Sequence, residues 1–237
     1  MAKKMIEDET PEVMNTTQRH LEEMQLRVAE HDVPGGPADR ELTEMKQRQI
    51  VERASAILFE KGFHGTSIRD IAQACDMSMG QLYHYISSKD DILFLMHLYS
   101  QEQWYRRLAD AGFEQITDPV AKLEHGVRTS IRHISENRAL YQFIFTESKY
   151  MDREHLQKAL DLDDRNVVGF YCHLLSELPG RSCADQEQHL AASIVAYIAT
   201  FLAMRGWNVD LHDQAAYDTA VETLVDFIFR GLGIERG

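Results

Sequence analysis

A helical pattern of apolar residues runs almost without interruption from Thr43 to the C-terminal region, and it constrains the fold more than any other feature. The apolar residues recur at spacings of three and four, which gathers them on one face of a helix. Glycine and proline break the pattern at places such as Gly62, Gly112 and Pro179-Gly180. A β-hairpin typically shows two runs of alternating apolar and polar residues joined by a turn such as Asn-Gly. The sequence contains no such pattern. The sequence therefore predicts an all-α fold, with helices at 43–61, 67–74, 78–85, 89–112, 118–136, 138–150, 152–178, 184–206 and 212–232.

The composition agrees with a helical protein that has a substantial core. The 237 residues include 13 glycines and five prolines, and 44% of them are hydrophobic. In average proteins glycine and proline together make up roughly 12% of residues, and this chain contains fewer. Collagen-like and low-complexity chains are therefore excluded, and a turn-rich β-sandwich is disfavoured. A chain of this length buries on the order of 70% of its extended surface. It therefore needs neither disulfide bonds nor a metal ion to stay folded.

The charges are distributed unevenly along the chain. The formal net charge is −13, which argues at first sight against a nucleic-acid partner. Residues 1–45 carry five Lys or Arg against eleven Asp or Glu, and residues 94–237 carry fourteen against twenty-one. Residues 46–93 carry six of each. This middle segment is spared the acidity of the rest, so we predict that it faces an anionic partner.

The first 42 residues form an acidic extension with a helix of its own. Met14, Leu21 and Val28 lie on one face of a predicted helix at 11–31, and Val33-Pro34-Gly35-Gly36-Pro37 begins a linker at 32–40. We expect the apolar face to dock on the body of the same chain or of a sister chain. A nucleic-acid-binding arm would be basic, and this segment is acidic.

The sequence contains no recognisable catalytic, cofactor or metal site. It has no HExxH, GxSxG, phosphate-loop or dinucleotide-binding motif, and its histidines do not form a set with convincing metal-ligand spacing. Cys75, Cys172 and Cys183 form no CxxC pair, and we expect reduced, mostly buried thiols. We therefore predict a protein that is not an enzyme and that has no cofactor and no metal.

No segment contains the roughly 18 consecutive apolar residues that a membrane span requires. The first ten residues, MAKKMIEDET, lack the apolar region of a signal peptide. The expected location is therefore the cytoplasm, without membrane contact. The longest uncharged stretch, Leu190 to Met204, has the length of a buried helix.

Residues 46–93 carry the pattern of a helix-turn-helix. The first of three helices places Ile50, Ala54 and Leu58 on one face, and Gly62 ends it. Thr66 is the expected N-cap of the second helix, Asp76-Met77 forms a tight turn, and Ser78 caps the third helix. Two short helices joined by such a turn place the second helix in the major groove of DNA.

This segment resembles the DNA-binding domain of the tetracycline-repressor (TetR) family of transcriptional regulators. The residues that carry the resemblance are Ile50, Ala54, Leu58, Phe59, Gly62-Phe63, Thr66-Ser67-Ile68, Ile71-Ala72, Ser78, Gly80, Leu82-Tyr83 and Lys89-Asp90-Asp91-Ile92-Leu93. The resemblance implies a DNA-binding domain at 43–93 and an α-helical ligand-binding and dimerisation domain at 94–237. It also implies a homodimeric repressor that binds a palindromic operator on double-stranded DNA and is released by a small-molecule effector.

The outward face of the third helix suits DNA contact. Gly80 has no side chain and permits a close approach to the phosphate backbone, and Gln81 can bond base edges. Tyr83 and His84 offer donors near the sugar-phosphate wall, and the resemblance implies that Lys89 contacts a phosphate. The expected DNA-binding residues are Thr66, Ser67, Ser78, Met79, Gly80, Gln81, Tyr83, His84 and Lys89.

The sequence departs from the family at several of these positions. Asp76 stands where the family often has Gly, although Asp tolerates left-handed backbone geometry better than most residues. Ile86 stands where Phe is usual, and Met79 and Ser87 occupy positions that are often basic or polar. We therefore expect a lower nonspecific affinity for phosphate than in a typical member.

The uncharged stretch at 190–204 also predicts dimerisation. A helix that is apolar on every face must be covered all round, either by a second subunit or by full burial within one subunit. With helix 212–232, it would form a four-helix interface of two-fold symmetry. The expected interface residues are Ile194, Ile198, Phe201, Leu202, Leu224, Val225 and Ile228.

The effector site is expected among the aromatic residues of the second domain, most of which form core. An apolar cavity would suit a hydrophobic effector. Arginines such as Arg128 and Arg132 could bind the phosphate or carboxylate of an acyl thioester, or could pair with the surplus acids. The expected ligand-binding residues are Trp104, Tyr105, Arg132, Tyr141, Phe145, Phe170 and Tyr171.

Helix 89–112 is expected to couple the two domains, because its two ends belong to different ones. The alternative function is a DNA-binding structural or docking protein of the same fold, whose acidic domain binds a protein partner. An internal cavity would favour the ligand-responsive regulator, and a filled core would favour the docking protein.

Overall fold

The computed structural model describes residues 37–182 and 186–236. Every regular element within those residues is helical, which confirms the predicted all-α fold. The predicted helix at 11–31 lies outside the described residues. Helix α2 begins at Pro37, three residues earlier than the predicted end of the linker, because proline is well suited to the first turn of a helix.

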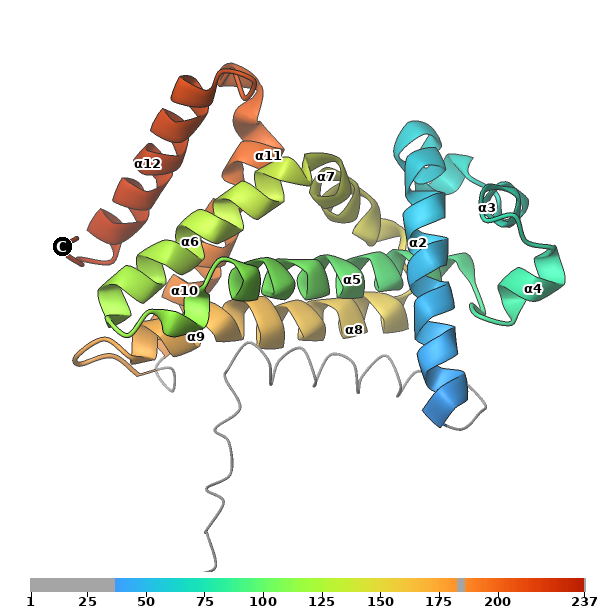
Figure 1. Ribbon diagram of the computed structural model, residues 1–237, viewed down its shortest axis with the longest axis horizontal. Helices are drawn as coiled ribbons and strands as arrows, with labels where there is room; N and C mark the ends of the chain where they lie inside the picture. Colours follow the sequence, from blue (N-terminus) through green and yellow to red (C-terminus); the bar gives the residue numbers. More distant parts are fainter. Residues whose placement is uncertain (1–36, 183–185, 237) are drawn as a thin grey trace, which may run out of the picture.

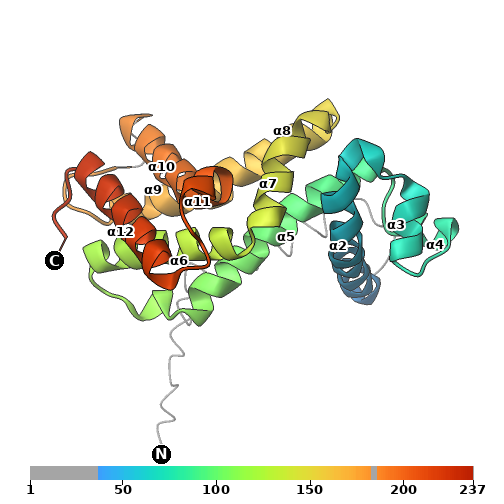
Figure 2. The same ribbon diagram turned by 90° about the horizontal axis from the view of Figure 1, so that it is seen from above.

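The chain divides into two helical bodies joined by one long helix (Figures 1 and 2). Helices α2 (Pro37–Gly65), α3 (Ile68–Ala74) and α4 (Met79–Tyr83) form the small body at one end. Helix α5 (Lys89–Asp110) runs from this body into the larger one.

The larger body contains the remaining helices. It comprises a 3₁₀ turn (Phe113–Gln115), α6 (Pro119–Glu136), α7 (Arg138–Glu147), a second 3₁₀ turn (Ser148–Tyr150), α8 (Arg153–Asp163), a π-helical segment (Asp164–Val168), α9 (Gly169–Ser176), α10 (Gln186–Ala199), α11 (Phe201–Arg205), a third 3₁₀ turn (Gly206–Asn208) and α12 (Gln214–Gly231). Helices α10 and α12 follow α9 in the chain and lie at the end opposite α4 (Figure 1).

Serine begins each of three successive helices in the same way. Ser67, Ser78 and Ser88 are the N-caps of α3, α4 and α5, and each forms a capping box with the residue three positions later. Such a box satisfies two backbone N–H groups that the helix itself leaves unpaired. The prediction of Thr66 as the cap of α3 is wrong by one residue. Its hydroxyl instead donates to the carbonyl of Gly62 at 2.8 Å.

Two predicted helices are interrupted in the structure. The pattern at 152–178 is divided by the π-helical segment Asp164–Val168, and the pattern at 184–206 bends by 49° between α10 and α11. Apolar spacing does not report such local changes of winding, because the same residues remain on the buried side. Among the described residues no single helix is long and apolar enough to cross a membrane, and the bent pair of α10 and α11 meets the criteria only when its two parts are joined.

Helix α5 contributes to two separate hydrophobic cores. Ile92, Leu95 and Tyr99 pack with the small body and with parts of α7 and α8. Trp104 and Leu108 pack with α6, α9, α10 and α12. The helix is therefore the structural link between the two bodies, as the sequence predicts for 89–112.

The cysteines differ from their expected state in one respect. Cys75 is a buried free thiol, and burial raises its pKa. Cys172 on α9 is disulfide-bonded, so the prediction of a reduced thiol is wrong there. A disulfide requires two side chains that are close in space, and the spacing of cysteines along the sequence does not show this.

Gly126 on α6 provides a test of the packing in the larger core. A Cβ atom at this position would lie 3.3 Å from side-chain atoms of Leu174 and Phe113. We expect Gly126→Val to lower the free energy of unfolding by about 1–3 kcal/mol, because a close-packed core does not absorb added atoms. Gly231→Ala is the control, since a Cβ at this helical position meets nothing within 4 Å. Urea unfolding of both variants measures the difference, and equal stabilities would contradict the packing described.

Candidate DNA-binding helix and interior cavity

The turn between α3 and α4 is fixed by backbone geometry and by one ion pair. Asp76 adopts a φ of 54°, the only left-handed backbone among the described non-glycine residues. Asp and Asn tolerate this region better than other residues, which explains how Asp serves at this turn. The Arg53 guanidinium on α2 holds the Asp76 carboxylate at 2.5 Å. The left-handed backbone of Asp76 and its ion pair with Arg53 therefore both stabilise the turn between α3 and α4.

Helix α4 presents a polar face to the outside. Leu82 is fully buried and Ile86, just beyond the helix, is almost so; these two residues attach α4 to the small core. Gly80, Gln81, Tyr83 and His84 are exposed, as are the capping residues Ser67 and Ser78, whereas Met79 is half-buried. These positions form one continuous outward face.

Gly80 is not required by the packing of the chain itself. A Cβ atom at this position would meet nothing within 4 Å, and its backbone has ordinary helical geometry. Glycine in a helix costs roughly 0.5–1 kcal/mol relative to alanine. A glycine with an intrinsic cost and no internal reason is consistent with close approach of an external surface.

Gln81 is partly engaged within α4. Its side-chain oxygen accepts a hydrogen bond from the Ser78 amide at 2.8 Å as part of the capping box. The amide nitrogen of this exposed side chain donates to no partner among the described residues. Gln81 can thus cap the helix and contact an external acceptor with different atoms.

Two predicted contact residues have internal partners instead. Thr66 is buried. The Lys89 ammonium donates to the carbonyls of Phe63 at 2.7 Å and Thr66 at 3.1 Å, and it lies 4.2 Å from the centre of the Phe63 ring. Two of its three N–H donors are therefore used to hold the end of α2 against the start of α5. Both side chains therefore support the segment between α2 and α3, a role that only the tertiary structure could show.

Other basic and polar side chains near α4 were not predicted from the sequence. Lys46 and Gln49 on α2 line a groove together with Gln81 and His84. Arg69 is exposed on α3. In the sequence, only the neutral charge balance of residues 46–93 pointed to such basic residues. Their position beside α4 depends on how α2 packs in the folded chain.

A cavity of about 490 Å³ lies among the helices of the larger body and is partly open to solvent, since the exposed residues Phe145, Leu160 and Tyr197 line it. Side chains from α5, α6, α7, α8 and α10 reach its wall. Four predicted ligand-binding residues line it: Trp104, Tyr141, Phe145 and Tyr171. The cavity is consistent with a small-molecule site, since such sites are mostly apolar hollows of roughly 300–1,000 Å³.

Three predicted ligand-binding residues do not line the cavity. Tyr105 is fully buried and donates to the Asn166 carbonyl at 2.6 Å, and Phe170 is a core residue. Arg132 lies on the outer face of α6, 3.3 Å from Asp218. The prediction is wrong for these three, because a count of aromatic and basic residues does not separate core, cavity and surface.

Two titratable side chains that line the cavity, His97 and Asp163, have shifted pKa values. Burial lowers the pKa of His97 to about 4, so the ring is neutral near pH 7, and its Nε2 lies 2.7 Å from the Ser148 hydroxyl. The surrounding protein and the neighbouring Asp164 raise the pKa of Asp163 to about 6. The Trp104 indole donates to Ser130 at 2.9 Å. Among the described residues, no Lys or Arg lines the cavity.

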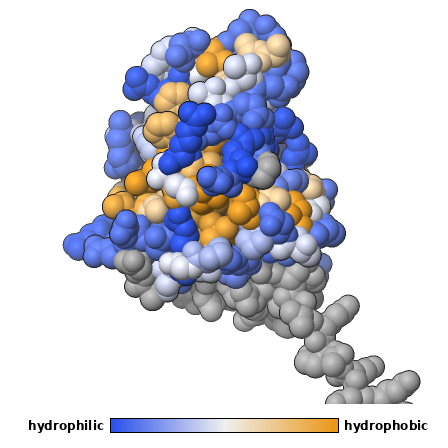
Figure 3. Space-filling view, turned by 90° about the vertical axis from the view of Figure 1, so that its left-hand side faces the viewer, coloured by the Kyte–Doolittle hydropathy of each residue, from blue (hydrophilic) through white to orange (hydrophobic). Residues whose placement is uncertain are grey.

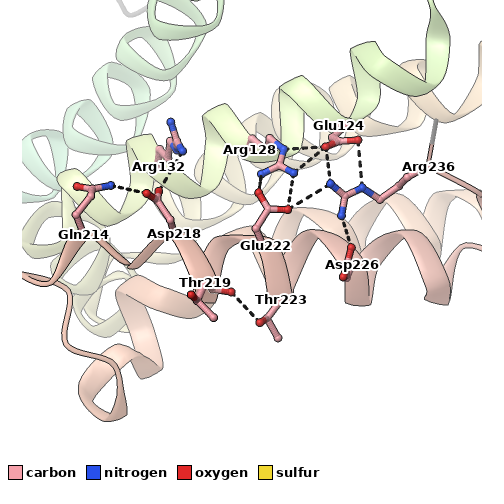
Figure 4. Close-up of polar contacts among 10 residues, drawn as sticks. All are labelled: Glu124, Arg128, Arg132, Gln214, Asp218, Thr219, Glu222, Thr223, Asp226 and Arg236. Carbon is pink, nitrogen blue, oxygen red and sulfur yellow. Dashed lines mark hydrogen bonds and ion pairs between the residues drawn. The ribbon is translucent and has the colours of Figure 1, made fainter. Parts of the chain in front are cut away.

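The arginines of α6 are paired with acids on the outer surface (Figure 4). Arg128 contacts Glu124 at 2.7 Å and also binds Glu222 on α12. Arg236 contacts Glu124 at 2.8 Å and Glu222 at 3.3 Å, and it also binds Asp226. The Arg128 hydrogen bond lowers the pKa of Glu222 to about 2. The alternative in which these arginines pair with surplus acids is the one found.

An exposed apolar stripe runs along α10 and into α11. Leu190, Ile194, Tyr197 and Phe201 are between 43% and 69% exposed and follow one another at helical spacing. Phe227 on α12 is 65% exposed. Figure 3 shows apolar side chains gathered on this end of the molecule within a polar surround.

The predicted interface residues divide between this surface and the core. Ile194 and Phe201 are exposed, and Ile198 and Leu224 are half-buried. Leu202, Val225 and Ile228 are buried in the core of the same chain. For these three the prediction is wrong, because apolar spacing does not show whether a face is covered by its own subunit or by a second one.

Polar contacts join the larger body to the region around α4. His155 on α8 has its Nε2 2.8 Å from the Asp91 carboxylate, and Asp91 accepts from the Ser87 amide at 2.6 Å in the turn after α4. Glu147 at the end of α7 accepts from the Phe63 amide at 2.9 Å. Leu156, next to His155, lines the cavity. One turn of α8 therefore touches both the cavity and the start of α5.

Comparison with known proteins identifies the small body. Residues 50–96 match the family described as "Bacterial regulatory proteins, tetR family". The chain therefore carries a TetR-family DNA-binding domain. The matched segment contains α3, α4 and the capped start of α5, which include the outward face described above.

Two curated relatives share this domain. The transcriptional regulator HbdR of Aromatoleum sp. (strain CIB) is 36% identical over 89 residues, which are 38% of each chain. The transcriptional repressor KstR2 of Rhodococcus jostii (strain RHA1) is 31% identical over 112 residues, 45% of this chain and 52% of that protein. The chain thus spans between about a fifth and a half of the length of the curated relatives it matches.

The fold similarity extends further than the sequence similarity. The crystal structure of AibR in complex with isovaleryl coenzyme A and operator DNA is similar to this chain with a TM-score of 0.60 and 20% identity. The match covers 78% of this chain and 98% of AibR. The larger body therefore has the fold found in TetR-like regulators, although its residues have diverged.

The raised pKa of Asp163 makes a prediction about stability. An acid whose pKa is about 6 in the folded protein and near the ordinary 3.8 in the unfolded chain favours unfolding as the pH rises between those values. We expect the stability of Asp163→Asn relative to the wild type to increase from about pH 4 to pH 6 and then to stay level. His97, Asp164, Tyr141 and Tyr171 are present in both proteins, so the comparison isolates the change at position 163. Thermal unfolding across this range measures the effect, and a difference that does not change with pH would contradict it.

Proposed function

We propose that this protein is a DNA-binding repressor of transcription that leaves its operator when a small molecule enters the cavity. The observation that carries the proposal is the pairing of two features in one chain. A TetR-family domain presents the open face of α4, and a separate body holds a cavity of about 490 Å³. Helix α5 and the contacts of α8 connect the two.

The DNA contacts divide between base edges and phosphates. The Gln81 amide nitrogen and the Tyr83 hydroxyl lie on the outward face of α4, which is the element that would enter the major groove. Ser67 begins a helix, whose N-terminal amides favour a phosphate. Lys46 on α2, in the groove beside Gln81 and His84, and the exposed Arg69 on α3 provide positive charges in the same domain as α4. They would fix the orientation of the domain without reading sequence.

The chain acts as a homodimer in this proposal. Leu190, Ile194, Tyr197 and Phe201 form a stripe of exposed apolar side chains. A contiguous exposed apolar surface of this kind is typical of an interface with another protein chain. Pairing of two such stripes around a two-fold axis would bury them and would place two copies of α4 on one side of the assembly. Two recognition helices roughly 34 Å apart would then contact the two halves of a palindromic operator.

Release of DNA would follow from differential binding of the effector to two arrangements of the chain. Filling the cavity would displace α8, on which Leu156 and Ala159 line the wall. His155 on the same helix contacts Asp91, which caps α5 beside the turn after α4. Movement of α8 would thus reach α4 through two side chains, and a tilt of α5 would carry the same change.

The cavity favours this function over a structural or protein-docking role. A docking protein would have a filled core and an external groove, whereas the larger body here holds a mostly apolar cavity among its helices. AibR was crystallised with isovaleryl coenzyme A, so an acyl thioester is one form of effector to consider. The arginines expected to hold its phosphates are committed to carboxylates, which favours a small hydrophobic molecule.

Gly80 tests the DNA-binding part of the proposal. We expect Gly80→Ala to reduce affinity for DNA roughly ten-fold or more, because the added methyl group lies between α4 and the DNA backbone. The folded protein should lose no stability, since alanine favours the helix by about 0.5–1 kcal/mol. The DNA is a sequence selected by the wild-type protein from a random library, and fluorescence anisotropy measures binding. Gly231→Ala, which is remote from α4, is the control, and equal affinities for all three proteins would remove Gly80 from the interface.

Ile194 and Phe227 test the dimer. A carboxylate placed in an apolar interface must lose its hydration without a partner, so we expect Ile194→Glu and Phe227→Glu to convert the dimer to monomers. Tyr150→Glu, at a similarly exposed aromatic residue outside the stripe, should remain dimeric. Sedimentation velocity at micromolar protein concentration distinguishes the two states. If Ile194→Glu and Phe227→Glu both formed dimers of unchanged stability, another surface would form the interface.

A further inference from the structure

The capping box of α4 decides which hydrogen bonds Gln81 can offer to an external partner. The backbone N–H of Ser78 donates to the Gln81 Oε1 atom at 2.8 Å, and the Ser78 hydroxyl accepts from the Gln81 backbone amide at 3.2 Å. Both bonds close the first turn of the helix, so the glutamine oxygen is turned back toward Ser78. The Nε2 amino group, with its two N–H donors, is the end of the side chain that remains free.

The free end of Gln81 lies where a recognition helix meets DNA. Gln81 is exposed in the first turn of α4, and the N-terminal residues of such a helix contact base edges in the major groove. Its amino group donates to no partner among the described residues. The neighbouring Gly80 has no side chain that could compete for the same base. Gln81 is therefore placed to read a base as a donor.

The four bases differ in what they offer to a group that only donates. Guanine presents two acceptors, O6 and N7, side by side in the major groove, whereas thymine presents the single acceptor O4. Adenine presents N7 beside an N6 amino donor, and cytosine presents only an N4 amino donor. An amino group that faces cytosine or the adenine N6 meets another donor. Guanine is thus the base best matched to the free end of Gln81.

The usual pairing of glutamine with adenine is opposed by the cap. That pairing uses both ends of the amide, because the oxygen accepts from N6 while the nitrogen donates to N7. The oxygen is the atom that the Ser78 amide already holds. Adenine can be bound in this way only if the oxygen is shared or the cap opens, and either weakens the bond to Ser78. Guanine requires no change in the cap.

We propose that the capping box of α4 makes Gln81 a donor-only reader of bases, which selects guanine at one position in each half of the operator. The inference rests on the proposed function in taking α4 as the helix that enters the major groove. It adds the base that this side chain reads and the intramolecular hydrogen bond that determines the choice.

Selection of operator sequences from a random library by the full-length protein and its variants tests the proposal. Gln81→Glu preserves the capping box and replaces the two free donors by an acceptor. We expect the wild type to enrich a G·C pair at one position of each half-site. Gln81→Glu should enrich the inverted C·G pair there, because the cytosine N4 amino group donates to a carboxylate. Gln81→Ala should show no preference at this position.

Gln73→Glu is the matched control for the added charge. Gln73 is exposed on α3 and lies outside the capping box of α4. Both glutamate variants should bind all DNA sequences more weakly than the wild type, because the DNA phosphates repel the new charge. Gln73→Glu should nevertheless select the same consensus as the wild type. Thermal unfolding of each variant verifies that it is folded.

A modified base measures the donor contact directly. 7-Deazaguanine has a carbon atom in place of N7, so it lacks one acceptor but retains O6 and its pairing with cytosine. We expect the wild type to bind the selected operator about three-fold or more weakly when both half-sites carry this base, as the loss of hydrogen bonds at N7 implies. Gln81→Ala should bind the modified and unmodified operators equally. Fluorescence anisotropy measures both affinities.

The outcomes separate this inference from the proposed function. An A·T pair at the position that depends on Gln81 would overturn the inference, because it would show that the capped oxygen takes part in reading. A G·C pair that Gln81→Glu does not invert, and whose N7 atom does not matter to the wild type, would also overturn it. Both results would leave the DNA-binding function intact. A wild-type protein that enriches no sequence would instead contradict the proposed function, and this inference with it.

Discussion

The continuity of α5 is the constraint on which the other parts of the structure depend. Residues near its start, such as Ile92, pack in the small core, and Trp104 and Leu108 pack in the larger one. A helix that is held in two cores cannot tilt at one end without moving the other. Its first turn is fixed by the Ser88–Asp91 capping box, and Asp91 is also contacted by His155. The position of α4 is thus linked to the packing around the cavity by the backbone of α5 and by the polar contact between His155 and Asp91.

The elements that repeat a simple sequence rule were predictable, and those that depend on tertiary packing were not. Helical spacing located the long helices because each buries one apolar face, and it located the helix-turn-helix because Ser78 and Asp76 have strong local preferences. It missed the π-helical segment after Asp163 and the bend between α10 and α11. The cap of α3 was placed at Thr66 instead of Ser67, because both residue types are good caps and only the fold decides which hydroxyl is buried.

The same distinction explains the outcome for the candidate sites. Exposure of Gly80, Gln81 and Tyr83 followed from the buried position of Leu82 on a short helix, which the sequence shows. The partners of Lys89 and Arg132 lie 23 to 26 and 86 residues away along the chain, so no local pattern could reveal that their charges are already occupied. The number of aromatic residues suggested a cavity, but only the packing separates Trp104 in its wall from Tyr105 in the core.

Asp163 and His155 lie on the same helix two turns apart, one facing the cavity and the other facing the start of α5. A ligand can shift the chain between two arrangements only if it binds one of them more tightly. Leu156 and Ala159 of α8 line the cavity, so a ligand can favour one position of this helix. If that arrangement shifts His155 relative to Asp91, the free energy gained in the cavity is coupled to the contact that holds the start of α5. By linkage, DNA bound at α4 must then weaken the ligand by the same factor.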